Sequence, residues 1–289
     1  MSTAARTRPR PPETADRAWI RETWPAVVVA FGLVAASAYG LLAVRPYRGI
    51  DAATVTAARA QDVCSLVVAV LLVALCRAGS GRVHLVRLAL LAYVAYSYAI
   101  YLLGLPMNRA FLVYVVLVAV AAGALLDGVL RLQPGAWPRA VRRLEAGTGW
   151  FLVAVSTLFS SLWLSMLLPF ALGGDRPHPQ GPGGVAYPVF VLDLCVALPC
   201  LALIGYLLLE GRSVAGPLAL VAVLKIVTLF TVLWAGAVAG LLRGDDVSLG
   251  ADAGPSLVMV GVCVWLATRW WRALPVSVPG RRAHLWPDE

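Results

Sequence analysis

Charged residues are scarce in this chain. Only 13% of its 289 residues are charged, whereas 60% are apolar, and the mean hydropathy is +0.80. A soluble globular protein is usually about 45–50% apolar and about 25% charged. So little polar surface cannot coat a soluble particle of this length, and the composition also excludes disordered, collagen-like and disulfide-rich secreted proteins. We therefore predict an all-α integral membrane protein whose first partner is the lipid bilayer.

The usual residues of metal, redox and nucleotide chemistry are also few. The three histidines, His84, His178 and His284, lie in connections or near the ends of apolar runs, and the five cysteines include no Cys-x-x-Cys pair. These absences argue against intramembrane zinc proteases, haem bundles and thiol–quinone enzymes. No glycine-rich loop ends in lysine, which argues against an ATPase. We predict no metal, no cofactor and no catalytic residue, and we leave enzyme activity open.

Apolar runs long enough to cross a bilayer recur along the whole chain. A transmembrane helix needs about 20 apolar residues to cross about 30 Å of hydrocarbon. Eight runs qualify, at roughly 24–44, 61–77, 85–105, 110–130, 149–172, 187–209, 216–241 and 255–273. We predict an eight-transmembrane-helix bundle within residues 21–275, a disordered basic cytoplasmic tail over residues 1–20, and a cytoplasmic C-terminal tail over residues 276–289.

The arginines predict the orientation of these runs. They gather in the N-terminal tail, the second and fourth connections and the C-terminus, whereas the first and seventh connections hold more acid for each arginine. Because cytoplasmic connections are rich in arginine, both termini are expected in the cytoplasm. The formal net charge of +9 is spread over the ends of apolar runs, so it predicts no nucleic-acid partner.

A weak internal similarity suggests a duplication. Gln61-Asp62-Val63-Cys64 in the second run is similar to Leu192-Asp193-Leu194-Cys195 in the sixth, and Trp24 and Trp150 open the first and fifth runs. Such repeats are common in multispanning proteins. Two four-helix repeats of the same orientation are one interpretation, and chance similarity between apolar runs is the other.

Several polar residues inside the runs are candidates for a site. An ionisable group at the bilayer centre costs roughly 2.5–3.5 kcal/mol and usually faces the bundle interior. The candidate ligand-binding residues are Asp62, Tyr93, Tyr96, Asp193, Lys225 and Thr228. The two aspartates are expected near the outer edge of the hydrocarbon, and Lys225, the only lysine, lies deeper. The set predicts an outward-facing polar cavity, although a purely structural network fits equally, and direct pairing of Asp193 with Lys225 stays open.

The same residues carry a family resemblance. Gln61-Asp62, the tyrosines of the third run, residues 108–114, and Asp193 with Lys225 resemble a pattern in uncharacterised bacterial multispanning membrane proteins. The basic tail and the preference for arginine over lysine point to an actinobacterial-type member. The resemblance implies a location in the bacterial plasma membrane and no mechanism.

Three functions fit the sequence. The first is binding or transport of a small molecule or lipid through the polar cavity. The second is a non-catalytic subunit of a membrane complex, with a membrane-protein partner and polar residues that only specify packing. The third is a membrane enzyme that uses Asp62 or Asp193 as a base at the outer interface.

Overall fold

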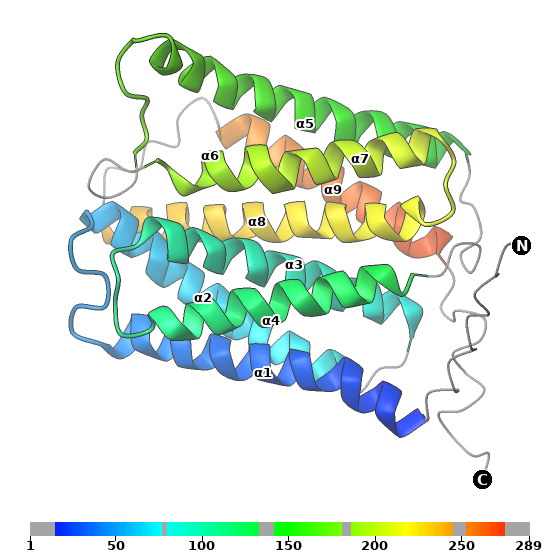
Figure 1. Cartoon of the computed structure of the whole chain (residues 1–289), viewed down its shortest axis with the longest axis horizontal. Helices are drawn as coiled ribbons and strands as arrows, with labels where there is room; N and C mark the ends of the chain where they lie inside the picture. The colour runs from blue at the N-terminus through cyan, green and yellow to red at the C-terminus, as the bar shows by residue number, and fades with distance from the viewer. Residues whose placement is uncertain (1–14, 77–79, 133–141, 181–185, 245–252, 275–289) are drawn as a thin grey trace, which may run out of the picture.

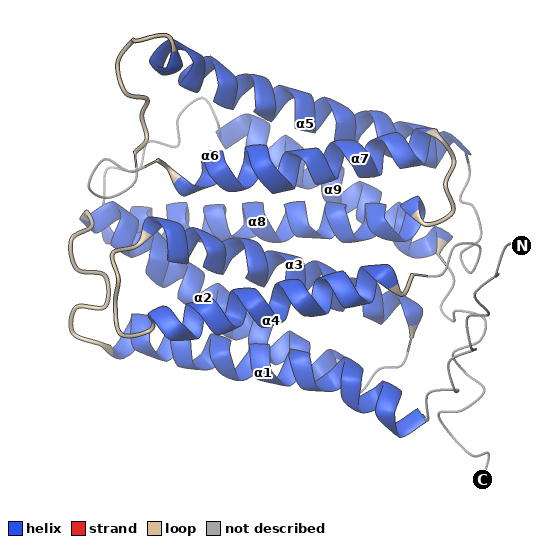
Figure 2. Ribbon diagram, in the orientation of Figure 1, coloured by secondary structure: helices blue, strands red, loops and turns tan. Residues whose placement is uncertain are grey.

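The computed structural model describes residues 15–76, 80–132, 142–180, 186–244 and 253–274, and these segments consist of helices and their connections, with no strand among them (Figures 1 and 2). The elements in chain order are α1 (Ala15–Leu42), α2 (Ala52–Leu75), α3 (Gly81–Gly104), α4 (Phe111–Leu130), α5 (Arg142–Ala171), α6 (Pro188–Leu192), the π-helical turn η2 (Asp193–Ala197), α7 (Leu198–Leu209), α8 (Ala215–Arg243) and α9 (Ala253–Ala273). The elements α6, η2 and α7 follow one another directly and make one continuous stretch.

The prediction of a multispanning helical protein is confirmed at this level. Among the described residues, seven helical stretches are long and apolar enough to cross a membrane, with Pro188–Leu209 counted as one. The eighth predicted run coincides with α9, whose last turn carries Arg272. The count of eight crossings therefore stays a prediction.

One helix begins well before its predicted start. The second run was expected from residue 61, but α2 begins at Ala52, so Arg59 lies within a helix and not in a connection. The Asp51 side chain caps this helix by accepting hydrogen bonds from the Thr54 backbone N–H (2.8 Å) and hydroxyl (2.6 Å). Asp62 consequently lies ten residues into α2, about 15 Å from its first residue.

The ends of the chain are described only in part. Helix α1 begins at Ala15, inside the tail expected over residues 1–20, and the remainder of that tail lies outside the described residues, as does the tail expected over residues 276–289. His84 lies in the first turn of α3 and is 8% exposed, so it belongs to a helix and not to a connection.

The Asp51 cap gives a pH-dependent prediction. Hydrogen bonds from the Thr54 hydroxyl and backbone N–H hold the pKa of the exposed Asp51 carboxyl below its ordinary value. Asp51→Ala is expected to lower the free energy of unfolding by about 1 kcal/mol at pH 7. A lowered pKa stabilises the fold above the unfolded pKa of about 3.9 and ceases to do so as the pH falls through the folded value. Unfolding in detergent should therefore show the variant approaching wild type below about pH 4.

Asp51→Asn is the matched control, because asparagine also caps helices. It should keep most of the stability at pH 7. An Asp51→Ala deficit of equal size at pH 7 and in acid would contradict the role of the carboxylate.

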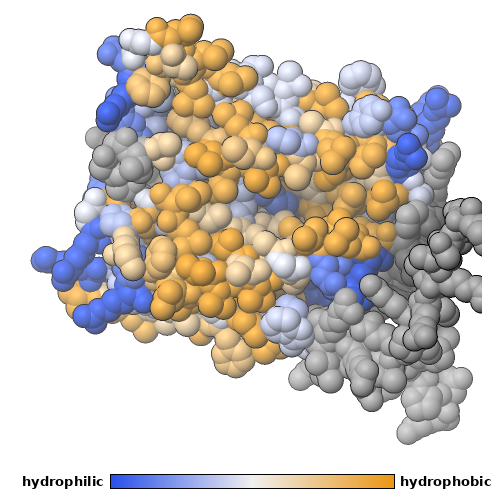
Figure 3. Space-filling view, in the orientation of Figure 1, coloured by the Kyte–Doolittle hydropathy of each residue, from blue (hydrophilic) through white to orange (hydrophobic). Residues whose placement is uncertain are grey.

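Helix α8 occupies the middle of the bundle. It packs against α2, α3, α7 and α9, and α1–α2, α3–α4 and α5–α7 form further packed pairs. In Figure 1, α8 runs between α5 and α7 on one side and α1, α3 and α4 on the other, with α9 behind. The face seen in Figure 3 is mainly apolar, as lipid contact requires, and exposed apolar residues such as Leu112 (73% exposed) occur on the outside of the bundle.

The α5–α7 pair packs unusually closely. A Cβ placed on Gly149 would lie 3.0 Å from the Gly205 carbonyl oxygen, and one on Gly205 would lie 2.8 Å from the Gly149 carbonyl oxygen. The Ser156 hydroxyl donates a hydrogen bond to the Leu198 carbonyl across the same interface (2.8 Å). Small residues let membrane helices approach and hydrogen-bond in this way. The contact fixes α5 against the stretch that carries Asp193.

Candidate functional site

A cavity of about 710 Å³ lies between α2, α3, α5, the α6–η2–α7 stretch and α8. Its lining runs along α8 from Lys225 to Ala237, which is about 18 Å of helix. Its walls are mainly apolar, with isoleucine, leucine, valine and phenylalanine side chains beside alanine, glycine and aromatic residues. Figure 3 shows hydrophilic atoms at the bottom of a hollow near the middle of an otherwise apolar face. The size and the mainly apolar walls are typical of small-molecule sites.

Asp193 stands at the polar end of this cavity. It begins the π-helical turn, in which the Leu198 N–H donates to the Asp193 carbonyl. Pro199 follows and has no N–H of its own for the helical ladder. The Tyr96 hydroxyl donates to one carboxylate oxygen (2.6 Å) and the Trp163 indole N–H to the other (2.9 Å). Two neutral donors from α3 and α5 thus hold the carboxylate in place.

Lys225 faces the same group from α8. Its Nζ lies 3.8 Å from the centre of the Tyr96 ring, a cation–π contact. Within the described segments, no ion pair of 4.0 Å or less joins Lys225 to Asp193. Tyr96 links them instead, because its ring contacts the ammonium and its hydroxyl binds the carboxylate. The pairing that the sequence left open is therefore indirect.

Thr228 adjoins this group but does not line the cavity. Its hydroxyl donates to the Lys225 carbonyl (2.8 Å) and so stays on its own helix. Trp163, by contrast, lines the cavity, and the sequence analysis did not select it. A tryptophan in the middle of an apolar run was the available signal, because a buried indole N–H usually has a hydrogen-bond partner.

Asp62 and Tyr93 lie elsewhere, among α1–α4. Asp62 is fully buried and accepts a hydrogen bond from the Tyr47 hydroxyl (2.6 Å), and Tyr93 is 1% exposed. Neither lines the cavity. Residues 93 and 96 are about 60° apart around a helix, which is enough for the two tyrosines to face different interiors. The residues expected in a single site thus form two separate groups, and Asp62, which is 0% exposed, has no contact with solvent.

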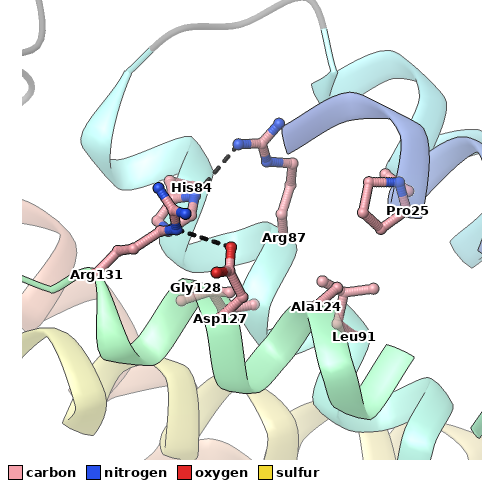
Figure 4. Close-up of a pocket in the computed structure, with 10 residues that line it drawn as sticks. Pro25, His84, Arg87, Leu91, Ala124, Asp127, Gly128 and Arg131 are labelled. Carbon is pink, nitrogen blue, oxygen red and sulfur yellow. Dashed lines mark hydrogen bonds and ion pairs between the residues drawn. The ribbon is translucent and has the colours of Figure 1, made fainter. Parts of the chain in front are cut away.

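A second, smaller pocket lies at the other end of α3, between α1, α3 and α4 (Figure 4). Its volume of about 40 Å³ suits a water molecule or a small ion. Figure 4 shows Arg87 directed to His84 (3.2 Å) and Arg131 to Asp127 (2.8 Å). Its basic side chains thus bind neighbours on their own helices, as helix-end anchors do.

Comparison with protein-family models, curated proteins and solved structures finds no match for this chain. Over the described part of the chain, no three His, Cys, Asp or Glu side chains come together as a metal site would need. Its chemistry is therefore argued from its own residues.

Proposed function

We propose that this protein binds an amphiphilic small molecule or lipid in the cavity, with an anionic head group on Lys225. The observation that carries the proposal is the environment of the Lys225 ammonium. It contacts the Tyr96 ring, and among the described residues no oxygen accepts a hydrogen bond from it. A partly buried cation that has no hydrogen-bond acceptor is stabilised by an anion that accepts its hydrogen bonds.

The walls of the cavity support an apolar tail. Leu229, Phe230 and Leu233 line it beyond Lys225 on α8, and Ile100 and Leu201 line it from α3 and α7. Leu233 is 57% exposed, so the cavity is open on this flank. An acyl chain that leaves the bilayer loses no hydrophobic contact in such a channel, and the head group supplies the specificity.

On the basis of the predicted topology, we extend the proposal from binding to transport. With eight crossings and both termini on the arginine-rich cytoplasmic side of a bacterial plasma membrane, Asp51 at the start of α2 faces outward. The cavity lining includes Asp51 and Gln180 at this end and Lys225 in the bundle. We therefore propose entry from the outer side.

The helix contacts support the proposed duplication. If α1–α4 correspond to α5–α9, then α3 corresponds to α8 and α2 to the α6–η2–α7 stretch. Exchanging the two halves then turns the contact between α3 and α8 into the same contact. It turns the contact between α2 and α8 into the contact between α6 and α3, and both of these contacts are present. Asp62 and Asp193 also each face the preceding helix of their own pair, at Gly40 and Trp163.

Lys225→Met tests the function, because methionine keeps an apolar stem and removes the charge. We expect the full-length protein in nanodiscs to bind radiolabelled palmitate, and the variant to bind it at least about tenfold more weakly. A hydrogen bond to a charged group contributes about 1.5–3 kcal/mol, and 1.4 kcal/mol is tenfold in affinity.

Thr228→Val is the matched control, since it alters a neighbouring side chain outside the cavity lining. It should bind palmitate as wild type does. Equal binding by wild type and Lys225→Met would reject the anchoring role. No palmitate binding by wild type, with a folded protein, would favour the alternative of a packing subunit.

A further inference from the structure

The interior of the α1–α4 group contains a second polar centre that the proposed function does not use. Within the described residues, six oxygens on its buried residues make no hydrogen bond of good geometry, although some of their hydroxyls lie near one another. These atoms are Ser37 Oγ, Asp62 Oδ1, Ser65 Oγ, Tyr93 Oη, Tyr98 Oη and Tyr114 Oη. Most buried polar side-chain atoms in proteins have a partner, so a group of this size requires an explanation.

Four of these oxygens belong to one place in the fold. Helices α1 and α2 pack as a pair, with Asp62 against Gly40. Ser65 follows Asp62 by three residues and Ser37 precedes Gly40 by three, so the two serines lie at the next level of the same antiparallel contact. The Tyr98 hydroxyl from α3 adjoins both serines. The carboxylate and three hydroxyls therefore surround one point between α1, α2 and α3.

Among the described residues, no side chain of opposite sign forms a close ion pair with the carboxylate in this centre, although Arg59 lies near enough to attract it. Asp62 and both serines are 0% exposed, and the Tyr47 hydroxyl binds only the other carboxylate oxygen of Asp62. Arg59, three residues earlier on α2, makes no ion pair within 4.0 Å of Asp62 in the described structure. A buried carboxylate without a counter-charge is strongly unfavourable, and an ion or a proton must neutralise it.

We propose that Asp62, Ser37, Ser65 and Tyr98 bind a dehydrated sodium ion. All four ligands are oxygens, which hard cations prefer. A single carboxylate balances one positive charge, so a monovalent ion suits the site better than calcium or magnesium. The site is independent of palmitate binding, because Asp62 faces α1 whereas Gln61 and Ala58 on the same helix line the cavity.

The thermal unfolding of the full-length protein in detergent tests this site. Ionic strength is held constant while sodium chloride replaces N-methyl-D-glucamine chloride. We expect Tm to rise with sodium and to saturate, with a total shift on the order of 5 °C. An equal shift when potassium chloride replaces N-methyl-D-glucamine chloride would overturn a sodium site, and wild type without a sodium-dependent shift overturns the proposal whatever the variants do.

Asp62→Asn should abolish the sodium shift, and Ser65→Ala should move its midpoint to higher sodium concentration. Asp193→Asn is the matched control, because it removes the other intramembrane aspartate and should keep the shift. A full shift in both Asp62→Asn and Ser65→Ala would overturn the site. If Asp62→Asn does not fold, the wild-type and Ser65→Ala titrations decide.

Discussion

Gly40→Ala is expected to destabilise the protein severely, although it adds one methyl group. A Cβ at this position would lie 1.9 Å from the Asp62 Oδ2 atom and 2.3 Å from the Tyr47 hydroxyl oxygen. Both groups must move, and the Tyr47–Asp62 hydrogen bond breaks. Overpacking costs about 1–3 kcal/mol and the loss of a charged hydrogen bond about 1.5–3 kcal/mol. Unfolding in mixed SDS and non-ionic detergent should show a loss of several kcal/mol.

Gly123→Ala on α4 is the matched control. No side chain or neighbouring backbone lies within 4 Å of a Cβ built there. Alanine in a helix is more favourable than glycine by roughly 0.5–1 kcal/mol, so this variant should unfold at an equal or higher SDS fraction. If the two alanine variants lose stability equally, the close α1–α2 approach is not the cause.

Trp270→Ala is expected to detach α9 from the bundle. Trp270 is fully buried, its ring packs on Gly216 of α8, and its indole N–H donates to the Thr148 hydroxyl of α5 (3.0 Å). One side chain therefore joins α9 to two other helices. Replacing a buried tryptophan by alanine costs about 3–5 kcal/mol. The free energy of unfolding should fall by this amount.

Cys263 reports whether α9 is the element that loosens. It is 0% exposed on the same helix. With the other four cysteines changed to serine, maleimide should label Cys263 slowly in the wild-type background and quickly in Trp270→Ala. Trp265→Ala, at a position 56% exposed on α9, should leave labelling slow. Fast labelling in the Trp265 variant, or slow labelling in Trp270→Ala, would contradict this account.

The sequence predicted the helical spans well because a bilayer imposes length and hydropathy on each of them. It misplaced the start of α2 because the first turns, Ala52 to Arg59, are only weakly apolar and end in an arginine, and their helix depends on alanine propensity and the Asp51 cap. Hydropathy describes whether side chains prefer lipid or water, and it carries no information about the hydrogen bonds that begin a helix. A helix that continues beyond its apolar segment is therefore invisible to it.

The candidate site was predicted in part for a related reason. Depth along a helix follows from residue number, and it places Tyr96 and Asp193 at a comparable level, where a hydrogen bond joins them; Lys225, expected deeper, reaches this group through the Tyr96 ring. The packing of the helices decides which interior each side chain faces. This packing places Asp62 away from the cavity. Tyr47 was missed because it lies in a connection, where tyrosine carries no signal of its own.

Helix α2 lies between the cavity and the buried centre around Asp62. Ala58 and Gln61 on one flank line the cavity. Asp62 on the opposite flank contacts Gly40 so closely that no further atom fits between them. The side chains that line the cavity and the carboxylate that contacts Gly40 therefore leave opposite flanks of one backbone, so substitutions at Ala58 or Gln61 and substitutions at Gly40 act on two separate sites.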